Sequence, residues 1–214
     1  MIILIDAVVG AGKSTLSEKL GEKLNIPVHY ELQNQTTMNL LEEFYKDKNR
    51  WSFALQIHFL NERFKMIKKI SKSGIGILDR SIFGDKIFAQ MLNEDGYMTD
   101  DEYSTYSSLL DSMLEHISSP DLLVYIDCDL ETAIERIKGR GREMEQATDS
   151  IYWSRLNDKY TKWYNGYNLS DKFSIGARSY HPNNEEDIDL IVSKIKSKLG
   201  IKEEDSNDTF GFPV

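Results

Sequence analysis

Short apolar runs alternate with amphipathic stretches along the chain. The first run, Ile2 to Ile5, is continuous and rich in β-branched residues, which is typical of a strand buried on both faces. Leucines then recur at positions 16, 20 and 24, a spacing that predicts a helix. The same reading predicts strands at residues 2–5, 27–30, 75–79, 122–126 and 172–175. It predicts helices at residues 13–24, 37–72 with a joint near 49–50, 83–92, 101–117, 129–138, 151–167 and 184–199.

The order of these elements predicts an α/β fold. Strands that alternate with helices form a parallel sheet whose right-handed crossovers put helices on both faces. We therefore expect a five-stranded parallel sheet in one domain over residues 1–200, followed by an acidic, flexible tail over residues 201–214. In such sheets, ligands bind beyond the carboxyl ends of the strands, so the residues just after each strand are the candidates for function.

Composition narrows the class of protein. The chain has 214 residues, 40% hydrophobic and 29% charged, which is ordinary for a globular protein. Its formal net charge of -9 argues against a nucleic-acid binder, which usually shows a basic footprint. The single cysteine, Cys128, allows no internal disulfide and favours a reducing, cytoplasmic location. Asp6 interrupts the apolar start and no basic leader precedes it, so we expect neither a signal peptide nor a membrane span.

A phosphate-binding loop follows the first predicted strand. Residues 7–15 read Ala-Val-Val-Gly-Ala-Gly-Lys-Ser-Thr, which fits the P-loop pattern except that Ala7 replaces the first glycine. Such a loop holds phosphate oxygens with backbone N–H groups at a helix N-terminus. Its lysine neutralises the β- and γ-phosphates, and its serine hydroxyl is placed to bind Mg²⁺. If position 7 requires a positive φ, alanine there costs about 1 kcal/mol. The candidate residues are Gly10, Ala11, Gly12, Lys13, Ser14 and Thr15.

Acidic residues follow three other predicted strands. They are Glu31, Asp79 and Asp127, and all three belong to the sheet edge that carries the P-loop. Together with Ser14, Asp79 is a candidate for holding Mg²⁺ through a water molecule, and Arg80 is a candidate for steadying the transferred phosphate or the substrate. For Asp127 we favour a structural role as the cap of the next helix.

Three arginines within seven residues form a second cluster: Arg136, Arg140 and Arg142. In most proteins such a segment is a solvated basic loop. Beside a P-loop, we favour a lid over residues 139–146 that closes on phosphate, because phosphoryl transfer depends mainly on positioning and charge neutralisation.

These motifs, in this order and spacing, resemble those of the deoxynucleoside kinases. The resemblance rests on the P-loop, on Asp79-Arg80-Ser81, on Arg-Gly-Arg-x-x-Glu in the predicted lid, and on the Tyr-Trp…Leu…Tyr…Tyr pattern after it. It extends to about residue 199 and is nearest to the bacterial deoxyadenosine/deoxyguanosine kinases. It implies Mg-dependent transfer of the γ-phosphate of ATP, or of another nucleoside triphosphate, to the 5′-hydroxyl of a deoxynucleoside in nucleotide salvage. It also implies a homodimer.

The resemblance further implies roles for individual residues. Glu31 matches the carboxylate that takes the proton from the 5′-hydroxyl, and Arg80 matches the arginine beside the 5′-oxygen. Tyr45 and Glu145 match the groups that hold the 3′-hydroxyl, and Gln56 matches the residue that pairs with the base edge. The arginines at 136, 140 and 142 match those of the lid, the first as a donor-binding residue.

Base choice is implied by one further pair. Arg63, seven residues after Gln56, and Asp85, six after Asp79, match a pair that marks sites for purines or deoxycytidine in this family, so we expect deoxyadenosine or deoxyguanosine as substrate and thymidine as a poor one. The alternative is that Arg63 and Asp85 form a surface ion pair unrelated to the base, and without the family context Arg63 would belong, like Gln56, to an exposed polar helix face. Tyr45 and Trp51 would then belong to the core, and the aromatic residues between 152 and 167 to packing.

Two other functions remain open at this point. A nucleoside monophosphate kinase of the thymidylate type also carries a P-loop and an Asp-Arg pair, although Glu31 would repel a phosphate at the acceptor position. A regulatory subunit that binds nucleotides with little turnover is the alternative outside enzymes.

Overall fold

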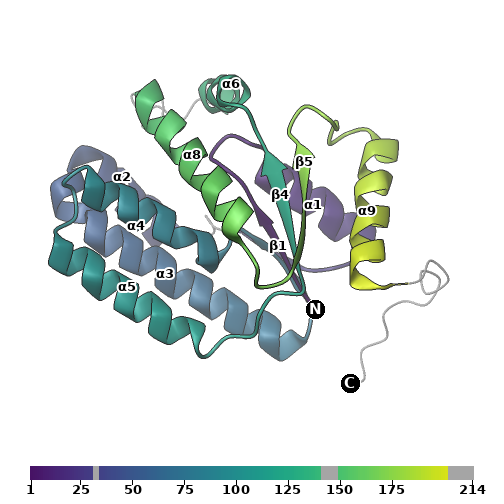
Figure 1. Ribbon diagram of the computed structural model, residues 1–214, viewed down its shortest axis with the longest axis horizontal. Helices are drawn as coiled ribbons and strands as arrows, with labels where there is room; N and C mark the ends of the chain where they lie inside the picture. Colours follow the sequence, from purple (N-terminus) through teal and green to yellow (C-terminus); the bar gives the residue numbers. More distant parts are fainter. Residues whose placement is uncertain (31–33, 141–148, 202–214) are drawn as a thin grey trace.

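Five parallel strands form one sheet in the order β2-β3-β1-β4-β5 (Figure 1). The computed structural model describes residues 1–30, 34–140 and 149–201. The strands are β1 (Ile2–Asp6), β2 (Val28–His29), β3 (Gly76–Asp79), β4 (Leu122–Asp127) and β5 (Asp171–Gly176). The predicted parallel sheet, with each strand at its predicted place, is thus confirmed.

Helices connect the strands and cover both faces of the sheet. They are α1 (Lys13–Leu24), α2 (Gln35–Lys46), α3 (Lys48–Ser73), the 3-10 turn η1 (Ile82–Gly84), α4 (Asp85–Glu94), α5 (Asp100–Leu114), α6 (Leu130–Arg140), α8 (Ser150–Gly166) and α9 (Glu185–Leu199). In Figure 1, α1 and α9 lie on one side of the sheet and α2 to α5 on the other. Within the described ranges, no helix combines the length and the apolar character that crossing a membrane requires.

Alternate residues of β1 supply the two halves of the core. Ile3 and Ile5 belong to the cluster that includes the buried leucines of α1 and isoleucines of α9. Ile2 and Leu4 belong to the second cluster, with the buried residues of α3, α4 and α5. Successive side chains of a strand point to opposite faces, so one central strand holds both helical layers in place.

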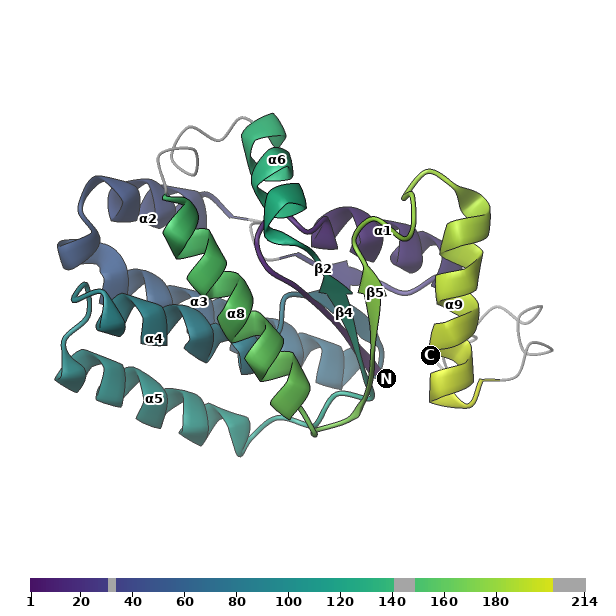
Figure 2. The same cartoon turned by 45° about the horizontal axis from the view of Figure 1, so that its top comes forward.

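Helix α8 lies between the two layers. Figure 2 shows it passing between the α2–α5 group and the sheet, with α6 above the carboxyl end of β4. Its residues Trp163 and Tyr164 pack against both core clusters. This position brings α8 beside the sheet edge that carries the P-loop.

The structure corrects several predicted boundaries. The joint expected near residues 49–50 lies at Asp47, which ends α2 and caps α3 by accepting from the Arg50 N–H at 3.1 Å. The helix expected from residue 83 begins at Asp85 after the 3-10 turn, and α5 ends at Leu114 in tight turns rather than at 117.

The expected cap of α6 was also wrong. Asp129, not Asp127, accepts from the Thr132 N–H, at 2.8 Å, because it stands at the N-terminus of the helix while Asp127 still belongs to β4 and has an exposed side chain. Helix α6 continues through Arg140, so the first two residues of the predicted lid loop are helical, and the rest of that loop lies outside the described residues.

Candidate active site

The P-loop connects β1 to α1 and depends on two glycines. Gly10 and Gly12 have φ angles of 86° and 95°, in the region that residues with a side chain rarely adopt. A Cβ on Gly10 would stand 2.5 Å from the backbone oxygen of Ala133, so a side chain has no room there. Ala7 has no positive φ: among the described residues other than glycine, only Asn25 and Arg80 do. The alanine therefore carries no conformational cost at this position.

Ser14 and Asp79 form an oxygen pair at the mouth of the P-loop. The Ser14 hydroxyl donates to Asp79 Oδ2 at 2.6 Å. Asp79 is buried, and its Oδ1 has no hydrogen-bond partner within the described part of the chain. A hydroxyl beside a carboxylate with an unsatisfied oxygen suits Mg²⁺, which takes one or two protein oxygens and completes its shell with water and phosphate. In the described ranges no three His, Cys, Asp or Glu side chains form a metal-binding group. The donor set therefore fits Mg²⁺ bound together with phosphates.

Asp6, at the end of β1, is a site residue that the sequence analysis missed. Its carboxylate is fully buried and accepts from the Ala7 N–H at 2.9 Å and the Ser81 N–H at 3.1 Å. Burial raises the pKa of Asp6, while the charges of Arg80 and Lys13 oppose that rise. The sequence could have identified Asp6 in the same way as Asp79, because each is the last residue of a strand. Asp6 thus joins the P-loop to the turn that carries Arg80.

Arg80 adopts a strained conformation beside Asp79. Its φ of 85° is left-handed, which costs a residue with a side chain about 1–3 kcal/mol. The side chain is buried, and its Nη1 donates to the hydroxyl of Tyr160 on α8. Strain of this kind concentrates at functional sites because surrounding contacts must hold it in place.

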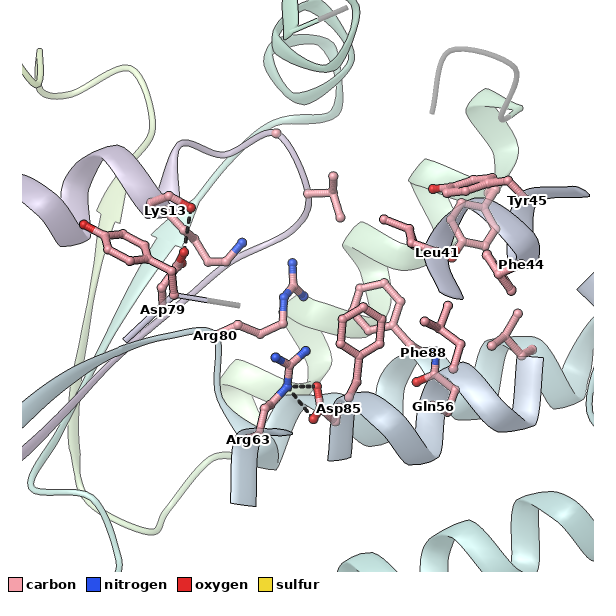
Figure 3. A pocket seen from close by; sticks show the side chains of 18 of the residues that line it. Lys13, Leu41, Phe44, Tyr45, Gln56, Arg63, Asp79, Arg80, Asp85 and Phe88 are labelled. Atoms are coloured by element: carbon pink, nitrogen blue, oxygen red, sulfur yellow. Dashed lines mark hydrogen bonds and ion pairs between the residues drawn. The ribbon is translucent and has the colours of Figure 1, made fainter. Parts of the chain in front are cut away.

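One cavity of about 350 Å³ joins these groups to the remaining candidates. We call the part lined by Gly10, Lys13, Ser14, Asp79 and Arg80 the phosphate end, and the part lined by Tyr45, Gln56, Arg63 and Asp85 the nucleoside end, after the roles that the family resemblance implies. Figure 3 shows Lys13 and Asp79 at one end, Tyr45 and Phe44 at the other, and Arg80 between them. The volume is within the usual range for small-molecule sites.

Arg63 and Asp85 form a buried ion pair. The Arg63 Nε lies 2.5 Å from each carboxylate oxygen of Asp85, and each side chain is 3% exposed. Arg63 lies on α3, two turns beyond Gln56, and Asp85 is the first residue of α4. The ring of Phe59 lies over the guanidinium at 5.3 Å. The alternative of a surface pair is therefore wrong, as is that of an exposed polar face for Gln56, which is buried.

Apolar and aromatic side chains from four helices form the walls. Those that the sequence analysis did not identify are Leu41 and Phe44 of α2, Leu55 and Phe59 of α3, Phe88 and Leu92 of α4, and Tyr152 and Trp153 of α8, together with Tyr30 after β2. Burial raises the pKa of Tyr152 to about 12. Nothing in the sequence distinguished these residues from ordinary core positions at helical spacing.

The expectations for aromatic residues need correction. Tyr45 lines the cavity, whereas Trp51 packs partly buried against the second core cluster. Tyr152, Trp153 and Tyr160 do more than pack, because the first two line the cavity and the third binds Arg80.

Other predicted residues lie elsewhere. Thr15 is exposed on α1. Arg136 donates to the backbone oxygens of Ala11 at 2.8 Å and Ala177 at 2.9 Å, and so links the P-loop to the segment after β5. Glu31, Arg142 and Glu145 lie outside the described residues, as does the side chain of Arg140.

Comparison with known proteins identifies the family. The sequence model described as "Deoxynucleoside kinase" matches residues 3–199, nearly the whole of the described chain. The chain belongs to the deoxynucleoside kinase family. This confirms the resemblance found in the motifs, and it makes the protein a phosphotransferase. The monophosphate kinase and the regulatory subunit lose their support.

Similar proteins act on purine deoxynucleosides and deoxycytidine, according to their names. The chain is 40% identical to the deoxyadenosine/deoxycytidine kinase of Bacillus subtilis (strain 168) over 203 residues, which cover 92% of this chain and 93% of that protein. It is 36% identical to the deoxyguanosine kinase of Lactobacillus acidophilus over 208 residues, with 92% and 90% covered.

A solved structure supports the same assignment of fold. Deoxyadenosine kinase from M. mycoides, solved with the products dCMP and dCDP, superposes with a TM-score of 0.79 at 30% identity, covering 92% of this chain and 100% of that one. The same enzyme with bound dATP gives a TM-score of 0.78 at 32% identity, with the same coverage. The P-loop kinase fold expected from the sequence is confirmed.

Proposed function

We propose that this kinase transfers the γ-phosphate of ATP, or of another nucleoside triphosphate, to the 5′-hydroxyl of a purine deoxynucleoside in nucleotide salvage. The observation that carries this proposal is that one cavity brings both groups of residues together. Lys13, Ser14 and Asp79 line one end, and Gln56 with the buried Arg63–Asp85 pair lines the other. A donor triphosphate at the first end and a nucleoside at the second would meet beside Arg80.

The phosphate end suits the donor. We assign the triphosphate to the N-terminus of α1, where the P-loop, with residues 10–15, and the Lys13 ammonium favour negative charge. Arg136 would support the same loop through its contact with the Ala11 oxygen. Ser14 and Asp79 would hold Mg²⁺, which supplies charge neutralisation on the phosphate oxygens when bound.

Glu31 is our candidate for the general base. It directly follows Tyr30, whose side chain lines the cavity, and it precedes Asn34, which caps α2 by accepting from the Thr37 N–H at 2.8 Å. The described residues on either side of Glu31 are thus fixed, and Tyr30 lies at the cavity, where the charge of Asp79 acts on its hydroxyl. A carboxylate delivered there could take the proton from the 5′-hydroxyl, while Arg80 stabilises charge on the transferred phosphate.

The nucleoside end suits a purine. We assign the 3′-hydroxyl to Tyr45 and Glu145 and the base edge to Gln56. The guanidinium of Arg63, fixed by Asp85 and by the Phe59 ring, offers donors to ring nitrogens or carbonyl oxygens and occupies the space that a thymine methyl group would need. A buried polar site rejects the wrong ligand by up to about 10⁴–10⁵ in favourable cases.

Several coarser expectations belong to the same proposal. We propose that Arg140 and Arg142 lie in a lid that acts on the transferred phosphate, that residues 1–200 form one domain with an acidic tail, and that the protein is a cytoplasmic homodimer. The resemblance to the family supports the lid and the dimer, and the single cysteine supports the location. Sedimentation equilibrium would test the dimer, with a mass twice that of one chain as the expected result.

Product analysis tests the proposed function. The purified protein is incubated with ATP and Mg²⁺ and either deoxyadenosine or dAMP, and the nucleotides are separated by chromatography. We expect dAMP from deoxyadenosine and no dADP from dAMP. Phosphorylation of the monophosphate alone would contradict the proposal, and a variant with Lys13→Ala controls for a contaminating kinase.

A further inference from the structure

The backbone of Arg80 is held from β1. Its own N–H donates to the Ile5 oxygen at 3.0 Å, and the next N–H, of Ser81, donates to the Asp6 carboxylate. These contacts keep Arg80 at its positive φ, and the left-handed turn directs the side chain into the cavity. The backbone contacts thus fix the position of the Arg80 Cα atom, and other contacts must fix the position of its guanidinium.

Tyr160 supplies such contacts from α8. Its hydroxyl accepts a hydrogen bond from Arg80 Nη1, and its ring centre lies 5.9 Å from the guanidinium carbon. The ring of Phe88 lies 5.0 Å from the same carbon and meets the Tyr160 ring edge to face at 6.0 Å. Tyr160 is fully buried, so its ring and hydroxyl have a fixed place. Together the two rings and the hydroxyl orient a planar, charged group.

The same helix also forms part of the cavity wall. Trp153 lines the cavity and stands seven residues before Tyr160, two helical turns away, so both lie on one face of α8. A change in the position of α8 would therefore move the cavity wall and the support of Arg80 together.

We propose that Tyr160 is a positioning residue for phosphoryl transfer, acting through Arg80. The inference rests on the proposed function. Charge stabilisation of a transition state is effective when the charged group is oriented before the reaction and pays no reorganisation cost during it. The bond to Tyr160 uses one of the five donors of the guanidinium and fixes the plane of the others. Tyr160 itself has no contact with the reacting atoms in this scheme.

The variant Tyr160→Phe removes the hydroxyl and keeps the ring. A hydrogen bond to a charged group orients Arg80, so we expect kcat to fall about 10- to 100-fold. The dissociation constant for deoxyadenosine, measured by calorimetry, should stay within about twofold, because the ring and the nucleoside wall are unchanged. Tyr167→Phe is the matched control. Tyr167 is also buried and directly follows the same helix, but its hydroxyl forms a hydrogen bond with the Ser170 hydroxyl and does not line the cavity. This variant should keep parental kcat.

A double-mutant cycle separates positioning from general damage to the fold. In the background of Arg80→Ala, adding Tyr160→Phe should leave kcat unchanged, because the residue that Tyr160 orients is gone. In Tyr160→Phe alone, the buried guanidinium of Arg80 loses its hydrogen bond to the tyrosine hydroxyl, which can destabilise the fold. The double variant has no guanidinium at this position, so it serves as a comparison without that cost. Parental kcat in Tyr160→Phe, or an equal loss with and without Arg80, would overturn the inference. A wild-type protein that phosphorylates neither deoxyadenosine nor deoxyguanosine would instead contradict the proposed function.

Discussion

The two ends of the cavity are built in different ways. The phosphate end takes most of its groups from one short segment, residues 10–15, and its geometry depends on the backbone angles of Gly10 and Gly12. The nucleoside end takes side chains from four helices, the neighbouring α2 and α3, then α4, and the distant α8. One end is determined by local conformation and the other by how four helices pack.

Their electrostatics differ as well. At the phosphate end the cationic Lys13 and Arg80 outnumber Asp79, the one acid that lines the described cavity there, whose carboxylate accepts from the Ser14 hydroxyl. At the nucleoside end the charge of Arg63 is neutralised by Asp85 inside the protein, so the site reads hydrogen-bonding groups rather than net charge. In the proposed function, this difference would direct a triphosphate to one end of the cavity and a neutral nucleoside to the other.

Glu31→Gln tests the group that we place where the two ends meet, and it carries the largest expected effect. Removing a general base should lower kcat about 10²–10⁴-fold, while the amide keeps the size of the side chain and deoxyadenosine binding survives. Steady-state kinetics and calorimetry measure the two quantities. The variant Glu42→Gln, exposed on α2 and paired with Lys46, is the control and should have parental kcat. Near-parental kcat in Glu31→Gln would remove Glu31 from this role.

Lys13→Ala tests the phosphate end alone. Losing a preorganised positive group at the transferred phosphate should reduce kcat about 10²–10³-fold. Deoxyadenosine binding should change little, because Lys13 lies at the opposite end of the cavity (Figure 3). Lys19→Ala is the control, because Lys19 lies on the same helix with its ammonium paired to Glu22 at 3.2 Å near the surface. It should leave kcat and deoxyadenosine binding unchanged. Equal losses of binding and rate in Lys13→Ala would show that the two ends are not separate.

Arg63→Met tests the nucleoside end through stability. Leaving Asp85 buried without its partner should lower the free energy of unfolding by about 3–5 kcal/mol. Adding Asp85→Asn removes the uncompensated charge and should restore part of the loss. Urea titrations measure both. As a control, Lys46→Met breaks exposed pairs with Glu42 and Glu43 and should cost less than about 1 kcal/mol. A loss in Arg63→Met as small as the control's would mean that the pair contributes little to the packed site.

Ala7→Gly should have the smallest effect. Because position 7 has no positive φ, glycine brings no relief of strain and should cost about 0.5–1 kcal/mol of stability through added chain entropy. Its kcat should remain within about twofold of the parental value. Gly10→Ala is the contrasting variant, since its Cβ would meet the Ala133 oxygen, and it should impair activity. A gain of activity in Ala7→Gly would show that alanine distorts the loop.

The phosphate end could be predicted from the sequence because its conformation is local. Gly10, Gly12 and Lys13 identify the loop by their spacing, and the parallel sheet follows from the alternation of β-branched runs and helical spacing, although the order of its strands does not. Asp79 and Arg80 were found for the same reason, as residues that follow a strand. Asp6 was missed because it directly follows the apolar run of residues 2–5, and was interpreted only as the residue that ends this run.

The walls of the nucleoside end could not be predicted from periodicity. Phe44, Phe88 and Trp153 have the spacing of core residues, and only the packing of four helices turns them toward a cavity. Arg63 and Asp85 were found through the family resemblance, whereas the residues alone left a surface pair open as an alternative. The pair is buried because α3 and α4 lie side by side. Local sequence patterns do not predict which helices pack together.

The kinetics of the four deoxynucleosides test the central claim most directly. With saturating ATP and Mg²⁺, kcat/KM is measured for deoxyadenosine, deoxyguanosine, deoxycytidine and thymidine on the same preparation. The buried Arg63–Asp85 pair leads us to expect one of the two purine deoxynucleosides as the main substrate, deoxycytidine as a weaker or comparable one, and thymidine as poor. A kcat/KM for thymidine equal to or above that for both purine deoxynucleosides would contradict the account.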